Sequence, residues 1–269
     1  MFCFSSTNIA LLILLLLTNK ALCQTYPLVK EQVDIPLWLN FNVERFDSKG
    51  NVLFLEANWQ AYTQITEANA VSILPFQQLQ HTLGYETQLQ HGFGVGLWGR
   101  HIARRGRGQL WGRLYLQHSG KIGKTDFYKQ IGIENTTFLN SPTATRHRQG
   151  VSGMLALARN FGMPHNRTLR ISTAYEASIL LDQVYSRRRI DQTRWRIEAA
   201  YTLTTRTSLG VFFIHATDYF FAEAEYNADL TLKKPDRLLN LLSPTFGLRL
   251  HYLVLPATMP SQPLRILPY

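Results

Sequence analysis

Apolar and polar residues alternate one for one along most of this chain. In the segment 190–203, one set of alternate positions is largely apolar and the other carries charged side chains, including Arg194, Arg196 and Glu198. Because the side chains of a β-strand point alternately to its two faces, each such segment predicts a strand with one apolar face and one charged face. No run of residues is both long and apolar enough to predict a membrane-spanning helix.

The alternation predicts about twelve strands, which cover 37–46, 52–63, 76–89, 93–102, 109–118, 127–137, 149–159, 168–179, 191–203, 208–217, 220–231 and 245–255. Clusters of turn-forming residues, such as 47–50, separate them. No shift in composition divides the strands into groups, so a single domain is expected over residues 36–255. Residues 24–35 form a short lead-in, and the proline-rich residues 256–269 form a tail that cannot continue a central strand.

Residues 1–23 have the features of a cleaved secretory signal peptide. The apolar run 9–17 is too short to cross a bilayer, and Ala21 and Cys23 supply small residues at the −3 and −1 positions of a cleavage site. Cleavage before Gln24 would leave 269 − 23 = 246 residues and would remove both cysteines, Cys3 and Cys23. A chain without thiols suits an exported protein built without disulfides.

The two faces of the predicted strands differ in chemistry. The apolar face includes Leu53, Leu55, Ala57, Trp59, Leu110, Leu114, Leu116, Ile131, Ile133, Leu169, Ile171, Tyr175, Phe246, Leu248, Leu250 and Tyr252. The other face includes six glutamates and six arginines, namely Glu44, Glu56, Glu86, Arg100, Arg113, Glu134, Arg170, Glu176, Arg194, Arg196, Glu198 and Arg249. Arginine is weakly hydrated and binds carboxylates through two parallel hydrogen bonds, so this set suits a confined interior better than a free surface.

This distribution favours an all-β fold, an antiparallel transmembrane β-barrel of about twelve strands with its charges in the lumen. Aromatic residues near the strand ends suggest an interfacial girdle, formed by Trp38, Tyr62, Trp98, Tyr128 and Tyr219. A soluble β-sandwich that binds a periplasmic partner is the alternative. The connection lengths disagree with the barrel in one respect. If strand 37–46 begins at the periplasm, the short turns lie outside the cell, and this indicates either a miscounted strand or an unusual loop arrangement.

Five of the predicted strand segments carry a family resemblance: PLWLNFNVERF, QLQHTLGYETQ, YKQIGIENTTF, RTLRISTAYEAS and QTRWRIEAAYTL. Across residues 36–255 the chain resembles the "domain of unknown function 2490" family, a group of Gram-negative, predicted outer-membrane β-barrels without assigned activity. The residues that match the family pattern are Glu134, Glu176, Gln192 and Arg194. The resemblance implies an outer-membrane location and a barrel architecture, and it implies no chemistry.

The twelve charged residues of the lumen are the main candidate site. They could form a charged constriction that selects solutes, or an ion-paired filling that stabilises a narrow barrel. Since the six glutamates and six arginines balance, 6 − 6 = 0, mutual pairing is favoured over a field of one sign. The sequence therefore predicts an outer-membrane barrel of unassigned activity, either a narrow pore or a structural membrane component.

A weaker hypothesis is a lipid or acyl hydrolase at the membrane rim that uses His118 and Ser119. A serine nucleophile needs a base within hydrogen-bond reach, and adjacent strand residues meet only if a turn bends the chain between them. The histidines show no metal-binding spacing, and no metal or cofactor is expected.

The expected partners follow from the charge and the location. The net charge of +10 includes basic clusters at 104–107 and 187–189, between strands, where they would meet anionic lipid headgroups or form solvated turns. We also expect the barrel-insertion machinery as a partner, no nucleic acid, and a monomer.

Overall fold

The computed structural model describes residues 28–32, 36–62, 76–104, 107–139, 147–181, 190–222, 225–226, 231–234 and 237–256. Its strands are β1 Leu28–Gln32, β2 Pro36–Phe46, β3 Val52–Tyr62, β4 Phe76–Gln88, β5 Phe93–Arg104, β6 Arg107–Ile122, β7 Thr125–Leu139, β8 His147–Met163, β9 Arg167–Leu180, β10 Gln192–Thr202, β11 Thr207–Ala222, β12 Glu225–Tyr226, β13 Leu232–Lys234 and β14 Arg237–Val254. The predicted signal peptide and the basic cluster 187–189 lie outside the described residues.

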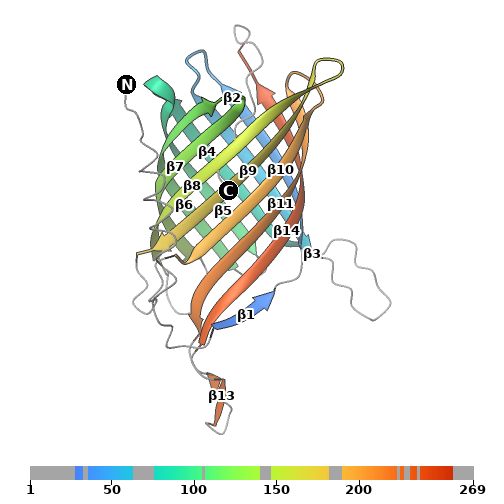
Figure 1. Cartoon of the computed structure of the whole chain (residues 1–269). Helices are drawn as coiled ribbons and strands as arrows, with labels where there is room; N and C mark the ends of the chain where they lie inside the picture. The colour runs from blue at the N-terminus through green and yellow to red at the C-terminus, as the bar shows by residue number, and fades with distance from the viewer. Residues whose placement is uncertain are drawn as a thin grey trace, which may run out of the picture.

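The strands form one closed β-barrel (Figure 1). Strands β2 to β11 follow one another as antiparallel neighbours, and β14 pairs with β11 on one side and with β2 on the other. The barrel therefore has eleven strands, and the closing pair β14–β2 is parallel. Neighbours in a meander alternate in direction, so the first and last of an odd number of strands must run the same way. The prediction of a barrel is confirmed, and the β-sandwich alternative is wrong.

The strand count differs from the predicted twelve because one long strand replaces two. The predicted strands 208–217 and 220–231 were separated by an apparent break, but Asp218 and Tyr219 continue the β11 ladder opposite Leu241 and Asn240. The last strand also begins at Arg237 and not at residue 245, so it includes Pro244. This proline falls between the two stretches of β14 that pair with β1 and with β2, and on the other side of β14 it lies opposite His215 of β11.

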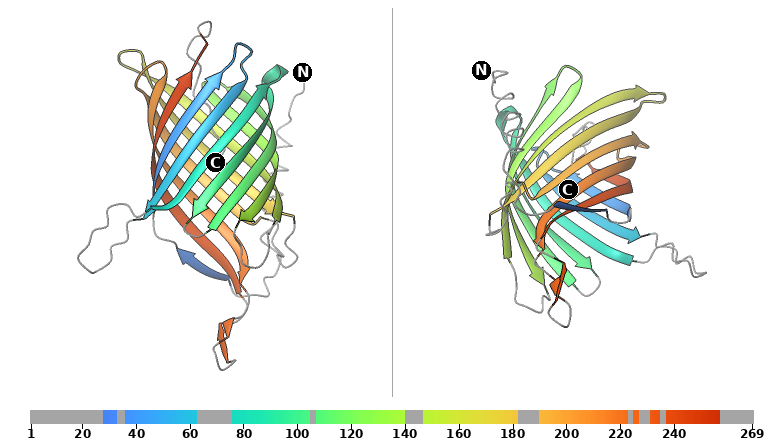
Figure 2. Two further views of the ribbon diagram at one scale, coloured as in Figure 1. Left: turned by 180° about the vertical axis from the view of Figure 1, so that it is seen from behind. Right: turned by 60° about the horizontal axis from the view of Figure 1, so that its bottom comes forward.

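The two ends of the barrel differ in the connections that join their strands. Five short turns, 47–51, 89–92, 123–124, 164–166 and 203–206, lie at one end of the barrel, which we call the short-turn end, together with the last residue of β14. β5 and β6, which are two residues apart in the chain, are joined at the opposite end. β2 begins at the opposite end, where β1 and the β12–β13 hairpin are found (Figures 1 and 2). We call it the long-loop end, because the strands that meet there include β3 and β4, which are 13 residues apart in the chain, and β11 and β14, which are 14 residues apart. The first and last barrel strands therefore begin and finish at opposite ends.

The turn between β2 and β3 shows how the short connections are held. The Oδ1 atom of Asp47 accepts backbone hydrogen bonds from Lys49 at 2.8 Å and Asn51 at 2.9 Å, and Gly50 takes a positive φ of 85°. The side-chain amide of Asn51 donates to Asp47 Oδ2 at 2.7 Å. The hydrogen bond from the Asn51 side chain is the main cause that lowers the pKa of Asp47. The turn chemistry predicted at 47–50 is thus a self-contained hydrogen-bonded loop.

The two faces of the barrel wall divide as the alternation predicts. Most of the large apolar side chains assigned to the outer face are exposed, including Leu53, Leu55, Leu110, Leu114, Leu116, Ile131, Ile133, Ile171, Phe246, Leu248 and Leu250. Ala57, Trp59 and Leu169 are partly exposed. The alternate positions are buried and mostly polar, as with Asn40, Asn42 and Glu44 on β2. The apolar side chains therefore cover the outside and the polar ones fill the bore.

The aromatic girdle is placed differently from the prediction. Trp98 and Tyr128 are buried in the bore, and Trp38 lies on the same inward set as Asn40. Tyr219 is partly buried, and the Tyr62 side chain lies outside the description. The exposed aromatic residues toward the short-turn end are instead Tyr85, Phe93, Phe161, Tyr201 and Tyr252. The inward orientation of these rings could not be predicted from the sequence, because each ring packs beside a small or polar residue of a neighbouring strand.

Inward-facing glycines make room for several of these rings. A Cβ atom added to Gly84 would lie 2.1 Å from the Phe54 ring, one at Gly96 would lie 2.3 Å from the Tyr115 ring, and one at Gly247 would lie 2.2 Å from the Phe212 ring. Gly96 belongs to the Gly-rich segment 92–99, and its place opposite the Tyr115 ring serves close packing inside the barrel. Each ring occupies the space that a side chain on the next strand would need.

Replacing Gly96 by valine should therefore destabilise the barrel by about 1–3 kcal/mol, because the new side chain displaces the buried Tyr115 ring. Gly99 is the matched control, since it lies on the same strand and a Cβ added there meets nothing within 4 Å. Unfolding of each variant in urea, followed by tryptophan fluorescence, gives the comparison. Equal stability of Gly96→Val and Gly99→Val would contradict the packing described here.

Candidate functional site

The bore contains all twelve charged residues that the sequence singles out. Eleven of them are buried, and the twelfth, Arg194, has a side chain that is 26% exposed. They come from nine strands, β2 to β7, β9, β10 and β14, at positions that alternate with the exposed apolar residues. Since a charged group removed from water is unfavourable unless it is paired, the contacts inside the bore decide what this set can do.

Arg113 on β6 is the centre of one group. Its Nη2 atom donates to Glu134 on β7 and to Glu176 on β9, and Nη1 donates to Gln130 at 3.3 Å. A second cation reaches the same carboxylate from β10, where Arg194 Nη1 lies 3.9 Å from Glu176 Oε2. The two arginines and two glutamates therefore balance in charge and join four strands.

A second group joins the strands around the barrel closure. Glu198 on β10 accepts hydrogen bonds from Arg196 at 2.7 Å and from Arg249 of β14 at 3.2 Å. Arg249 Nε also donates to Asn40 Oδ1 on β2 at 2.9 Å, and the Asn40 amide donates to Glu56 on β3 at 2.7 Å. The parallel β14–β2 seam is thus bridged from the inside by charged and amide side chains.

The remaining carboxylates have different partners. Glu86 accepts hydrogen bonds from Gln117, from Gln88 at 2.5 Å and from the Tyr115 hydroxyl at 3.2 Å, and Tyr128 in turn donates to Gln117. The Glu44 carboxylate lies 3.6 Å from His251 Nε2. Neutral side chains therefore donate hydrogen bonds to Glu86, whereas the equal numbers of glutamates and arginines would suggest that each glutamate pairs with an arginine.

Arg100 and Arg170 complete the set. Arg100 Nε donates to Thr82 at 2.8 Å, and its guanidinium lies 4.9 Å from the centre of the Trp98 ring. Arg170 lies 3.5 Å from Asp126, a carboxylate that the predicted set did not include. A cation over an aromatic face is stabilised by the ring quadrupole, so the tryptophans are partners of the bore arginines.

Ring and guanidinium contacts also join side chains from strands that are not neighbours. Trp111 on β6 packs edge-to-face with Trp98 on β5, with 5.9 Å between the ring centres. Arg194 reaches Trp111 from β10, four strands away around the barrel, with its guanidinium carbon 5.3 Å from the ring centre. Arg113 lies 5.1 Å from the Trp98 ring. Two rings and three guanidinium groups thus form one connected cluster inside the bore, between β5 and β10.

The hydrolase residues are not brought together. β6 continues straight through both positions, so His118 lies among the outer-face rings of Phe93, at 4.6 Å, and Phe127, at 5.4 Å. The Ser119 hydroxyl donates to the carbonyl oxygen of Gly92 at 3.3 Å. Within the described part of the chain, no hydrogen bond joins the two side chains. The arrangement lacks the base that a serine nucleophile requires.

Within the residues that the structure describes, no group of three or more histidine, cysteine, aspartate or glutamate side chains is placed to hold a metal ion. Among the same residues, no helix has the length and apolar character needed to cross a membrane. Comparisons of the chain with protein-family models, with curated proteins and with solved structures each found no match.

Proposed function

We propose that the chain is an outer-membrane β-barrel of a Gram-negative bacterium whose bore is closed by its own side chains. In this proposal the protein is a structural membrane component and not an open diffusion pore. The observation that carries it is the inverted distribution of residues, with exposed Leu, Ile, Phe and Val around the wall and buried glutamates and arginines within. Soluble monomers rarely expose apolar patches larger than a few hundred Å², whereas lipid requires such a surface.

Three further points support this proposal. The resemblance to the "domain of unknown function 2490" family agrees with it, as does the expected signal peptide at residues 1–23. Short turns of outer-membrane barrels face the periplasm, and the last residue of β14 lies at the same end as the short turns. We therefore place the short-turn end in the periplasm and the long-loop end at the cell surface.

The closed bore follows from the cluster formed by Trp98, Trp111 and their arginines. Barrels of intermediate strand number can be filled by side chains or can hold water. Here aromatic rings and guanidinium groups contact one another inside the bore and ion pairs join strands that are not neighbours, so we expect that solutes would have to displace paired charges to pass. This favours the ion-paired filling over the charged constriction.

Three measurements on the same protein test both parts of the proposal, the membrane location and the closed bore. The protein should remain with membranes after carbonate extraction, should migrate faster on gels before heating than after, and should give no stepwise currents in planar bilayers. The double variant Trp111→Ala/Arg194→Ala should conduct, because it removes the contact across the bore. Trp195→Ala, on the neighbouring outward position, should not. Release from membranes with heat-independent mobility would exclude the membrane location, and steady currents through the unmodified protein would exclude the closed bore.

A further inference from the structure

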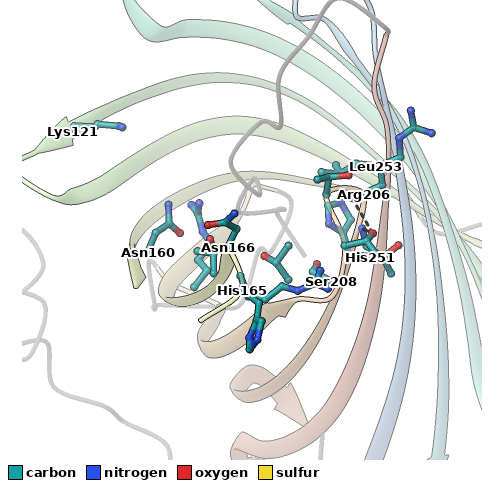
Figure 3. Close-up of a pocket in the computed structure, with 15 residues that line it drawn as sticks. Lys121, Asn160, His165, Asn166, Arg206, Ser208, His251 and Leu253 are labelled. Atoms are coloured by element: carbon teal, nitrogen blue, oxygen red, sulfur yellow. Dashed lines mark hydrogen bonds between the residues drawn. The ribbon is translucent and has the colours of Figure 1, made fainter. Parts of the chain in front are cut away.

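The short-turn end of the barrel contains a cavity that is separate from the cluster of Trp98, Trp111 and Arg194 in the bore. It has a volume of about 600 Å³ and lies among the ends of β6, β8, β9, β10, β11 and β14 and the turns 164–166 and 203–206 (Figure 3). We call this cavity the vestibule. In Figure 3, Asn160, His165 and Asn166 line one side, and Arg206, Ser208 and His251 line the other. The volume is within the range of small-molecule sites.

The charges that line the vestibule have one sign. Lys121, Arg167, Arg170 and Arg206 contribute to its wall, together with two histidines, and none of the fifteen lining residues is an aspartate or glutamate. Lys121 and Arg170 contact Asp126, which lies outside the lining, at 3.9 Å and 3.5 Å. Arg167 and Arg206 form no ion pair with any residue that the structure describes. The charge balance of the bore therefore ends at the vestibule.

Neutral hydrogen-bond donors accompany these cations. Five threonines and Ser208 line the vestibule, most of them within residues 202–208. The Thr204 hydroxyl oxygen already accepts hydrogen bonds from the backbone N–H groups of Arg206 at 3.1 Å and Thr207 at 2.9 Å. Its own hydrogen is therefore available to donate toward the cavity. Guanidinium and hydroxyl donors together match the oxygens of a phosphate group.

Two buried side chains also lack partners for their nitrogen atoms. Arg170 is 7% exposed, and its Nε atom has no hydrogen-bond partner in the described part of the chain. His251 is 4% exposed, and the same holds for its Nδ1 atom. A buried guanidinium N–H without an acceptor is unfavourable, and an anion in the vestibule would supply one. The other ring nitrogen of His251, Nε2, lies 3.6 Å from the Glu44 carboxylate, so Nδ1 would donate to an anion only when the imidazole is protonated on that atom. Both residues line the cavity, so the unsatisfied groups and the excess positive charge coincide.

We propose that the vestibule binds a phosphate group, carried either by a small solute or by a lipid headgroup. Arg167, Arg170 and Arg206 would bind the phosphate oxygens, and the hydroxyl groups of 202–208 would complete the contacts. The proposal stands apart from the closed bore and from the membrane location, because it concerns residues at one mouth of the folded barrel. Its test can therefore fail while the proposed function holds.

Isothermal titration of the full-length folded protein in maltoside micelles provides the test, with inorganic phosphate and a short-chain phosphatidic acid as separate probes. Arg206→Gln changes an exposed turn residue and should weaken binding about tenfold, which corresponds to one charged hydrogen-bond contact. Arg170→Gln should do the same if the variant keeps its heat-modifiable mobility. Lys49→Gln removes a charge from the same end of the barrel but outside the vestibule, and should leave the affinity unchanged.

The outcomes separate the two sources of phosphate. Binding of inorganic phosphate that depends on Arg206 supports a soluble ligand. Binding of phosphatidic acid alone, with the same dependence, supports a lipid headgroup. The proposal is overturned if neither probe binds, or if Arg206→Gln and Lys49→Gln weaken binding equally, since that would indicate a general attraction to a basic protein.

Discussion

Replacing Arg113 by methionine should destabilise the barrel by about 3–5 kcal/mol, the usual cost of removing one partner from a buried ion pair. The change would leave Glu134 and Glu176 buried near each other, with Arg194 at 3.9 Å as the remaining cation. It would also remove the guanidinium that lies 5.1 Å from the Trp98 ring. Urea unfolding in lipid vesicles, followed by gel mobility of unheated samples, measures the loss.

The cause can be separated from a general loss of packing. Adding Glu134→Gln to Arg113→Met should restore most of the stability, because the remaining carboxylate of the group, Glu176, still has Arg194 as its cation. Arg159→Met is the matched control, since Arg159 is exposed at the outer face and should cost less than 1 kcal/mol. If Arg113→Met is no more harmful than Arg159→Met, the ion pairs do not stabilise the barrel.

Placing an arginine on the outer face should have an effect that depends on depth. Leu114 is near the middle of β6 and 50% exposed, whereas Ile122 is the last residue of the same strand and 68% exposed. In a bilayer, Leu114→Arg should cost about 2–4 kcal/mol, and Ile122→Arg about 0–1 kcal/mol, because the second charge reaches the interface. Unfolding free energies of the two variants in the same vesicles give the comparison.

The depth dependence distinguishes lipid from water. In water both substitutions place a charge on a solvated surface, and each should change stability by no more than about 0.5 kcal/mol. Two small and equal effects would therefore contradict the membrane proposal, even if the barrel itself is folded. A large loss at Leu114 alone would support it.

The period-two alternation contains enough information to predict the two faces of the wall. Leu114, Leu116 and Ile133 are exposed and Arg113, Glu134 and Glu176 are buried, as alternation requires once the strands pair. The strand count was harder to predict because local signals conflicted with the ladder. Asp218 and Tyr219 suggest a break, yet they continue the β11 ladder opposite Leu241 and Asn240. Pro244 affects only where the last strand begins, and it lies where β14 changes partner from β1 to β2.

The partners inside the bore could not be predicted from the sequence. Arg113 reaches Glu176 two strands beyond β7, and Arg194 reaches Trp111 four strands away, which depends on register and on barrel curvature. The alternate glycines were a usable signal, because Gly84 and Gly96 mark where the Phe54 and Tyr115 rings turn inward. The vestibule could not be predicted from the sequence, because its residues come from turns and strand ends that lie far apart in the chain.

Spin labelling can measure directly whether the apolar outer face of this barrel contacts the hydrocarbon of a bilayer, as we propose. Nitroxides attached to single cysteines at Leu114, Leu116 and Ile133 would report on the wall, and one at Lys124 in the β6–β7 turn would report on the aqueous end. In vesicles, the wall positions should be relaxed strongly by oxygen and weakly by a water-soluble nickel chelate, with the opposite result at Lys124. Equal access of the nickel chelate to Leu114 and Lys124 would contradict the account.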